Sequence, residues 1–172
     1  MRDEKNSGKS IDRVDFLNFL VTTVIDITRK MTGLELLPSQ DISLGAASGV
    51  ASFSTRTSGD FRVSLGMSAH IELLKEITRR MKSQTEVSMG DVEMYGSEYF
   101  NIIFGMLLSH VNNTMHTRTC FHVPLFSESL YPVRSLDDRY WHVRALTCSY
   151  GTMEVGFCEP AETESLIESR IV

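Results

Sequence analysis

One long amphipathic helix is the feature that most constrains how this chain can fold. At about 100° per residue, five apolar residues of the segment after residue 88 share one side: Phe100, Ile103, Phe104, Leu107 and Val111. The sequence Ser-Met-Gly-Asp from Ser88 to Asp91 is a Ser-x-x-acid capping signal, so the helix should begin there and run to about His116. A helix of this length with one apolar side has to pack that side against another layer of structure.

Two further helices and several strands are predicted around it. A first helix should span residues 11–31 and end at Thr32 and Gly33, and a second should be capped by Ser68 and end near Lys82. Apolar and β-branched residues predict a short strand and a hairpin before the long helix, at 34–37 and at 49–54 with 61–67, joined by a turn at 57–60. They predict later strands at 120–124, 130–133, 140–149 and 153–158, with a short helix at 163–169.

These elements predict one α+β domain, with helices packed on a largely antiparallel β-sheet. The chain has 172 residues and no Pro- or Gly-rich linker. We therefore expect a disordered segment at residues 1–10, a domain at 11–160 and a tail at 161–172.

Charge and hydropathy exclude several classes of partner. A net charge of −5 disfavours nucleic acid and anionic membranes as partners. No apolar run approaches the length of a membrane span, and the first ten residues are polar, without the apolar region of a secretory signal. A cytoplasmic location is therefore expected.

The cysteines and histidines indicate no metal site. The three cysteines have no Cys-x-x-Cys spacing, and we expect them to be reduced, buried and mostly on strands: Cys120, Cys148 and Cys158. The five histidines form no pair with metal-ligand spacing.

The polar side of the long helix is the candidate functional site. It carries Glu98, Asn101, Gly105, Ser109, Asn112 and Asn113. Glu98 and Asn101 are three residues apart, so both can touch one small object. Gly105, one turn further on, leaves the surface open to a close approach. A carboxamide donates and accepts hydrogen bonds and could align a water, and a carboxylate could anchor a lysine. The alternative is an ordinary solvated helix face.

The spacing of these residues also resembles that of a known family. Glu98, two residues, Asn101, and then 22 residues before Pro124 is similar to the motif of the CheC/CheX chemotaxis phosphatases. The family motif starts with Asp or Ser, and Met94 stands at that place here. The likeness continues in the first helix, which ends in Lys-Met-Thr-Gly-Leu, and in the strand pair at 49–65, and it covers residues 11–158.

This resemblance, closest to the CheX type, implies a duplicated fold and a phosphatase acting on a phosphorylated CheY-like response regulator. Glu98 would pair with a lysine of the receiver domain, and Asn101 would orient the attacking water. Gly105, Ser109 and Asn112 would contact the partner. The chain would need no cofactor of its own, because Mg²⁺ would sit on the receiver domain.

Two other interpretations remain open. The same surface could bind a receiver domain or a flagellar-switch component without hydrolysis, which Met94 and the divergent stretch at 125–139 favour. The chain could instead be a structural dimerisation domain that has kept the motif.

An echo of the motif lies in the first helix, where Asp15 and Asn18 repeat the acid-x-x-Asn spacing. CheC-type proteins can carry two sites, so this pair could be a second, vestigial site. An ordinary solvated helix face is the alternative, and Thr22 stands where the glycine would be.

A homodimer is also expected, mainly from the resemblance to the CheX type. In the segment 140–149, alternation leaves apolar residues on both faces of the strand. One face can meet the helices, and the other face, or an open edge, could meet a second copy. The alternative is a monomer whose sheet is covered by the C-terminal tail.

Overall fold

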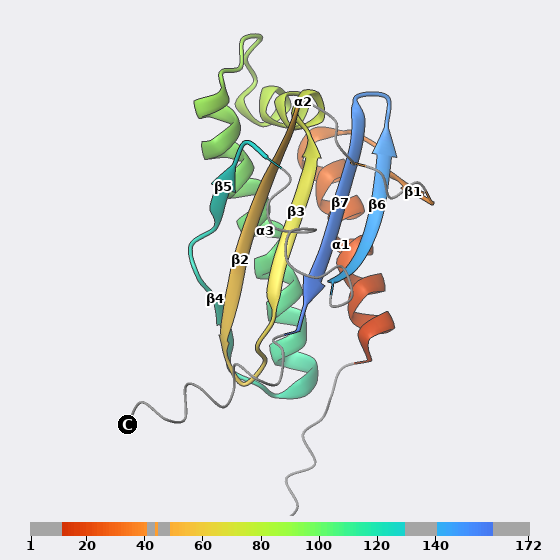
Figure 1. Cartoon of the computed structure of the whole chain (residues 1–172), viewed down its shortest axis with the longest axis vertical. Helices are drawn as coiled ribbons and strands as arrows, with labels where there is room; N and C mark the ends of the chain where they lie inside the picture. The colour runs from red at the N-terminus through yellow and green to blue at the C-terminus, as the bar shows by residue number, and fades with distance from the viewer. Residues whose placement is uncertain (1–11, 41–43, 45–48, 130–140, 160–172) are drawn as a thin grey trace, which may run out of the picture.

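The computed structural model describes residues 12–40, 44, 49–129 and 141–159 (Figure 1). Three helices are described: α1 (Arg13–Thr32), α2 (Ile71–Lys82) and α3 (Met89–Met115). Seven strands are described: β1 (Leu37–Ser39), β2 (Val50–Gly59), β3 (Ser64–His70), β4 (Thr119–Phe121), β5 (Leu125–Ser127), β6 (Trp141–Cys148) and β7 (Gly151–Cys158).

Every pairing between the described strands is antiparallel. Their order is β1-β6-β7-β3-β2-β4, and β5 pairs with β2 along the same edge as β4. The long strands β2, β3, β7 and β6 form the centre, and the three-residue strands lie at the two edges. The sheet is thus built mainly from two hairpins, β2–β3 and β6–β7, that meet where β3 pairs with β7.

The helices and the sheet enclose one hydrophobic core. In Figure 1, α1 and α3 lie behind the sheet along its strands, and α2 lies at the end where β3 stops. Alternate strand residues such as Phe53, Met67 and Phe157 are buried on the helical side. Phe53 meets Phe100 of α3, with ring centroids 6.2 Å apart, and Phe157 meets Phe16 of α1 edge-on at 4.6 Å. The predicted α+β domain with helices on an antiparallel sheet is confirmed.

Local signals located the helix ends well, with one error. Ser88 caps α3 in a full capping box with Asp91, and α1 stops at Gly33, which adopts a left-handed φ of 70°. Ser68 was wrongly predicted to cap the second helix. It lies inside β3, fully buried, and its hydroxyl contacts Ser52 at 2.9 Å across the strand pair. Helix α2 begins three residues later, and the carbonyl of Gly49 accepts the hydrogen bond from its first backbone N–H.

The predicted hairpin exists, but its turn comes later than expected. β2 continues to Gly59, whose φ is 102° and whose missing Cβ would lie 2.1 Å from the carbonyl oxygen of Arg118. β5 was not predicted. The expected strand at 130–133 and the expected tail helix at 163–169 lie outside the described residues, as do the expected terminal segments at 1–10 and 161–172.

The cysteines lie on strands as predicted, but their expected burial is wrong. Cys120 of β4 is exposed, and Cys148 of β6 and Cys158 of β7 are half-buried. β4 is an edge strand of three residues, and short edge strands bury their side chains less completely than the central strands do.

None of the helices within the described ranges has the length and apolar character required to cross a bilayer.

Candidate functional site

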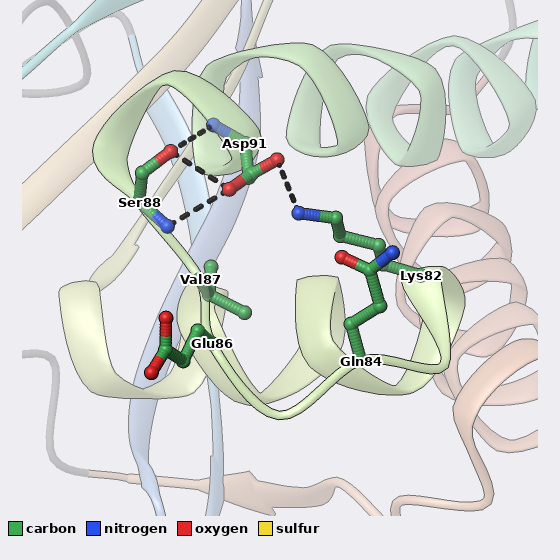
Figure 2. A pocket seen from close by; sticks show the side chains of 6 residues that line it. All are labelled: Lys82, Gln84, Glu86, Val87, Ser88 and Asp91. Carbon is green, nitrogen blue, oxygen red and sulfur yellow. Dashed lines mark hydrogen bonds and ion pairs between the residues drawn. The ribbon is translucent and has the colours of Figure 1, made fainter.

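The start of α3 is held by a cluster of charged and polar groups (Figure 2). The Ser88 hydroxyl accepts the backbone N–H of Asp91 at 3.1 Å, and the Asp91 carboxylate accepts the backbone N–H of Ser88 at 2.9 Å. Lys82 at the end of α2 donates to the same carboxylate at 2.8 Å. That hydrogen bond from Lys82, with those from Ser88, holds the pKa of Asp91 well below its usual range. Asp91 therefore stays ionised and ties α2 to α3.

A pocket of about 420 Å³ lies over this cluster, between the end of α2 and the start of α3. The charged groups of Lys82 and Asp91 already pair with each other, and the Ser88 hydroxyl is part of the helix cap. We assign this pocket a structural role in orienting α3.

Two contacts in the middle of α3 set its rotation against the core. Gly96 faces the sheet so closely that a Cβ there would lie 2.3 Å from Cζ of Phe53. Tyr99, fully buried, exchanges a hydrogen bond with Thr28 of α1. Burial raises the pKa of Tyr99, so its hydroxyl is neutral. With these two residues turned inward, the opposite side of α3 faces outward.

That outward side carries the predicted site residues in a stripe with spacings of three and four. Met94, Glu98, Asn101, Gly105 and Ser109 follow one another along it. Glu98 and Ser109 are exposed, Asn101 and Gly105 are half-buried, and Met94 is 58% exposed. The Glu98 carboxylate forms no hydrogen bond or ion pair with the described residues. It is therefore available to a partner at the surface.

Asn101 has an unusual environment within this stripe. Its side-chain oxygen is buried and has no hydrogen-bond partner in the described residues. Buried carbonyl oxygens nearly always accept a hydrogen bond, and leaving one unsatisfied costs about 1–3 kcal/mol. Asn101 would therefore gain by turning toward a donor supplied from outside, such as a water or a partner group.

Next to Asn101 along the stripe is an open pocket of about 460 Å³. It lies between the later half of α3 and β4, and its lining comprises Gly105, Leu108, Ser109, Asn112, Asn113 and residues 119–121. A Cβ on Gly105 would meet only the ring of Phe121, at 4.0 Å. A glycine in the middle of a helix costs about 1 kcal/mol relative to alanine, and no contact within the described structure requires it here.

Asn112 builds one wall of this pocket with its whole carboxamide. Its nitrogen donates to the carbonyl of Thr119 at 2.8 Å, and its oxygen accepts from the Thr119 N–H at 2.9 Å and from the Thr117 hydroxyl at 3.0 Å. Asn112 thus fastens β4 to the end of α3. Its predicted contact with a partner stays a prediction, and its amide atoms are already engaged.

The second wall of the pocket was missed by the sequence reasoning. Residues 119–121 of β4 supply it, and they pair with β2 at Thr57, Ser58 and Gly59. The one sequence signal pointing to this region was the spacing to Pro124. The structure places Pro124, half-buried, in the connection between β4 and β5, and both strands pack beside α3.

The second predicted pair lies on α1, away from this pocket. Asp15 and Asn18 are both exposed, and the Thr22 hydroxyl donates to the backbone carbonyl of Asn18 at 2.9 Å. Between this pair and α3, Phe19 stacks on His110 with ring centroids 3.8 Å apart. Nothing in this arrangement tests a second site, which remains a prediction.

Across the described residues, no group of three or more His, Cys, Asp or Glu side chains is placed so that it could hold a metal ion. The stripe offers the carboxylate of Glu98, the carboxamide of Asn101 and the hydroxyl of Ser109, next to a pocket lined by uncharged residues.

Comparison with known proteins identifies the fold. No protein-family model matches the sequence, and no curated protein matches it. Solved structures do match. The chemotaxis protein CheX from Vibrio vulnificus superposes with a TM-score of 0.69 at 18% identity, over 87% of this chain and 99% of that one. A CheC-like superfamily protein from Shewanella sp. PV-4 gives 0.70 at 17% identity, over 87% and 100%.

A third match is a complex. CheX from Borrelia burgdorferi, solved with CheY, BeF3 and Mg²⁺, superposes with a TM-score of 0.67 at 14% identity, over 88% of this chain and all of that one. The chain therefore has the fold of CheX and CheC-like chemotaxis proteins, as the sequence resemblance predicted.

Proposed function

We propose that this protein is a phosphatase that hydrolyses the phosphoaspartate of a CheY-like response regulator. One observation carries the proposal: Glu98 and Asn101 lie one turn apart on the outward stripe of α3, and the Asn101 oxygen has no partner within the described chain. A CheX of the same fold forms a complex with CheY, which supports a CheY-related chemotaxis role.

The reaction requires little covalent chemistry from this chain. A phosphoaspartate is an acyl phosphate, so its P–O bond is already reactive and needs mainly a water in line with phosphorus. The water oxygen bonds to phosphorus, the bond to the aspartyl oxygen breaks, and the aspartate carboxylate leaves with the electron pair. The products are aspartate and inorganic phosphate, which retains the oxygen and protons of the water. Asn101 would hold that water through its carboxamide.

Glu98 would position the receiver domain. An exposed carboxylate one turn from Asn101 can form a charge-assisted hydrogen bond with a lysine of the partner. Such a pair would aim Asn101 at the phosphoryl group. The chain would use no cofactor of its own, and Mg²⁺ on the receiver would neutralise charge on the phosphoryl oxygens. A partner of this kind would be cytoplasmic, so we propose a cytoplasmic location for this protein.

We further propose that the active protein is a homodimer. Within the described chain, β1 pairs only with residues 145–147 of β6, so no strand borders Trp141–Arg144 on the outer side. Trp141 and Val143 are half-buried on the face opposite the helices. An edge of this kind can pair with a second copy.

Phosphate release tests the function directly. The full-length protein is mixed with phosphorylated receiver domains from the same genome in Mg²⁺, and phosphate is measured against each receiver alone. We expect faster release with at least one receiver and little activity on small phosphate esters. Hydrolysis of esters with no effect on any receiver would refute the proposal.

Met94 favours a second candidate function, a receiver or flagellar-switch binding module without hydrolysis. Its exposed thioether stands one turn before Glu98, where the resembling family has Asp or Ser. Binding of a phosphorylated receiver with no acceleration of phosphate release would select this alternative. Met94→Asp would then be expected to raise turnover.

A further inference from the structure

The two glycines in the middle of α3 have different explanations. Gly96 is required by the fold, because any side chain there would collide with Phe53. At Gly105 a Cβ would have only an ordinary contact at 4.0 Å, so the fold itself accepts alanine at this position. No contact among the described residues therefore accounts for the missing side chain at Gly105, and close approach of another molecule would account for it.

The surroundings of Gly105 indicate what could approach it. The pocket next to it is lined by the ring of Phe121 and by the polar residues Ser109 and Asn113, among others. None of its lining residues carries a formal charge at neutral pH. A charged group entering it would lose water without finding a counter-charge, so the pocket favours a neutral occupant.

The position of the pocket indicates where that occupant comes from. Gly105 is one helical turn after Asn101 on the same stripe, so at a rise of about 1.5 Å per residue the two Cα atoms are about 6 Å apart along the axis. A protein whose phosphorylated residue reaches Asn101 must also cover Gly105.

We propose that the pocket over Gly105 is a docking site for an uncharged loop of the receiver domain, and that it sets which receivers this protein accepts. The loop places an apolar side chain over Gly105 against Phe121, and its backbone exchanges hydrogen bonds with Ser109 and Asn113. This inference rests on the proposed function, because the receiver domain is the partner whose loop it assigns.

Filling the pocket is the first test. In Gly105→Leu the new side chain fills the space above the helix. In Gly105→Ala the added methyl group fits without displacing Phe121 and fills only part of that space. The control is Thr114→Leu, which places the same leucine side chain at an exposed position of α3 outside the pocket. With a phosphorylated receiver as substrate, we expect KM to rise about tenfold or more for Gly105→Leu and less for Gly105→Ala, with kcat within about twofold. Thr114→Leu should match the wild type.

Folding is checked separately by thermal unfolding. Gly105→Ala should unfold at the same or a higher temperature than the wild type, because alanine favours the helix. If Gly105→Ala raises KM while its unfolding temperature is unchanged or higher, general damage to the fold cannot be the cause.

Cys120 provides a readout that is independent of activity. It is exposed and lies in the pocket wall, whereas Cys148 is half-buried on β6, at a distance in the sheet. Alkylation by iodoacetamide is followed at each cysteine by mass spectrometry, with and without a receiver held in its phosphorylated form. We expect the receiver to slow alkylation of Cys120 at least about fivefold relative to Cys148, and this protection to be weaker in Gly105→Leu.

The outcomes separate this inference from the proposed function. If the protein dephosphorylates a receiver but Gly105→Leu does not change KM, or the receiver does not protect Cys120 from alkylation, the docking site is wrong. The proposed phosphatase function is not affected by either result. Protection of Cys120 without turnover supports the docking site and refutes the phosphatase. If neither turnover nor protection occurs with any receiver, both are wrong.

Discussion

Asn101 is the residue on which the proposed chemistry depends. Replacing it with alanine removes the carboxamide that would align the water, so we expect kcat for receiver dephosphorylation to fall at least about 100-fold. KM should change little, because Glu98 and the pocket over Gly105 remain. In Asn101→Gln kcat should fall by a similar factor, since the extra methylene moves the amide away from its position. Single-turnover phosphate release measures both variants, and full turnover by Asn101→Ala would show that the assignment is wrong.

Glu98 should act on binding before it acts on chemistry. Glu98→Ala removes a charge that would pair with a lysine of the receiver, and we expect KM to rise about tenfold or more. Wild-type KM should rise with salt, because ions screen the pair, and this salt dependence should be weaker in the variant. Titrations at low and high ionic strength test this. An equal salt dependence in both proteins would exclude Glu98 as the anchor.

Between helices, a charged cluster links α1 to α2. Glu76 is 7% exposed and accepts hydrogen bonds from Arg79 at 2.7 and 2.8 Å and from Arg80 at 2.6 Å. Arg80 also donates to the carbonyl of Thr32 at the end of α1, at 2.8 Å. The hydrogen bond from Arg79, helped by that from Arg80, lowers the pKa of Glu76 to about 2, although burial acts in the opposite direction.

This pKa predicts how stability depends on pH. A carboxyl whose pKa is lower in the folded state stabilises the fold above its unfolded pKa, and the contribution disappears as the pH falls toward the folded pKa. Glu76→Gln should therefore lower the free energy of unfolding by roughly 1–3 kcal/mol at pH 7, and the difference from wild type should shrink between about pH 4.5 and pH 2. Urea unfolding at several pH values measures it.

Glu72→Gln is the matched control, because Glu72 lies on the same helix and pairs with Lys75 at 3.0 Å but is 75% exposed. Glu72→Gln should lower the free energy of unfolding by well under about 1 kcal/mol, with little dependence on pH. If Glu76→Gln behaves like Glu72→Gln, the cluster does not stabilise the contact between α1 and α2.

For the whole molecule, the order of the strands separates the two proposed surfaces. The open edge at residues 141–144 of β6 and the pocket beside β4 lie toward opposite ends of the sheet. A dimer formed through β6 would leave both copies of the α3 stripe free to bind receivers. Light scattering of the full-length protein at micromolar concentration should give twice the 19.4 kDa mass of one chain.

Val143→Asp tests this dimer at the β6 edge, since it places a charge where two copies would meet. We expect the mass to fall to that of one chain, with phosphatase activity per chain largely retained. A wild-type mass near 19.4 kDa would refute the dimer.

The sequence by itself determined the parts of the protein that depend on neighbouring residues. The capping box at Ser88 and the left-handed residue Gly33 are local signals, and the helices they bound were predicted within about two residues at those ends. Periodicity likewise placed Glu98, Asn101 and Gly105 on one outward stripe, because all three belong to one regular helix.

Only the tertiary structure decided what depends on residues far apart in the chain. The local sequence at Ser68 is typical of a helix cap, but in the structure Ser68 lies inside β3 and contacts Ser52 of the neighbouring strand. Helical periodicity places Gly96 and Gly105 on opposite sides of α3, but it does not show that Gly96 has to be a glycine. The contact with Phe53, more than forty residues earlier in the chain, shows that. The pocket beside Asn101 exists because β4 pairs with β2, where Thr119 lies opposite Gly59, and so is held next to α3. Long-range packing, which no local pattern encodes, is the physical reason for each of these differences.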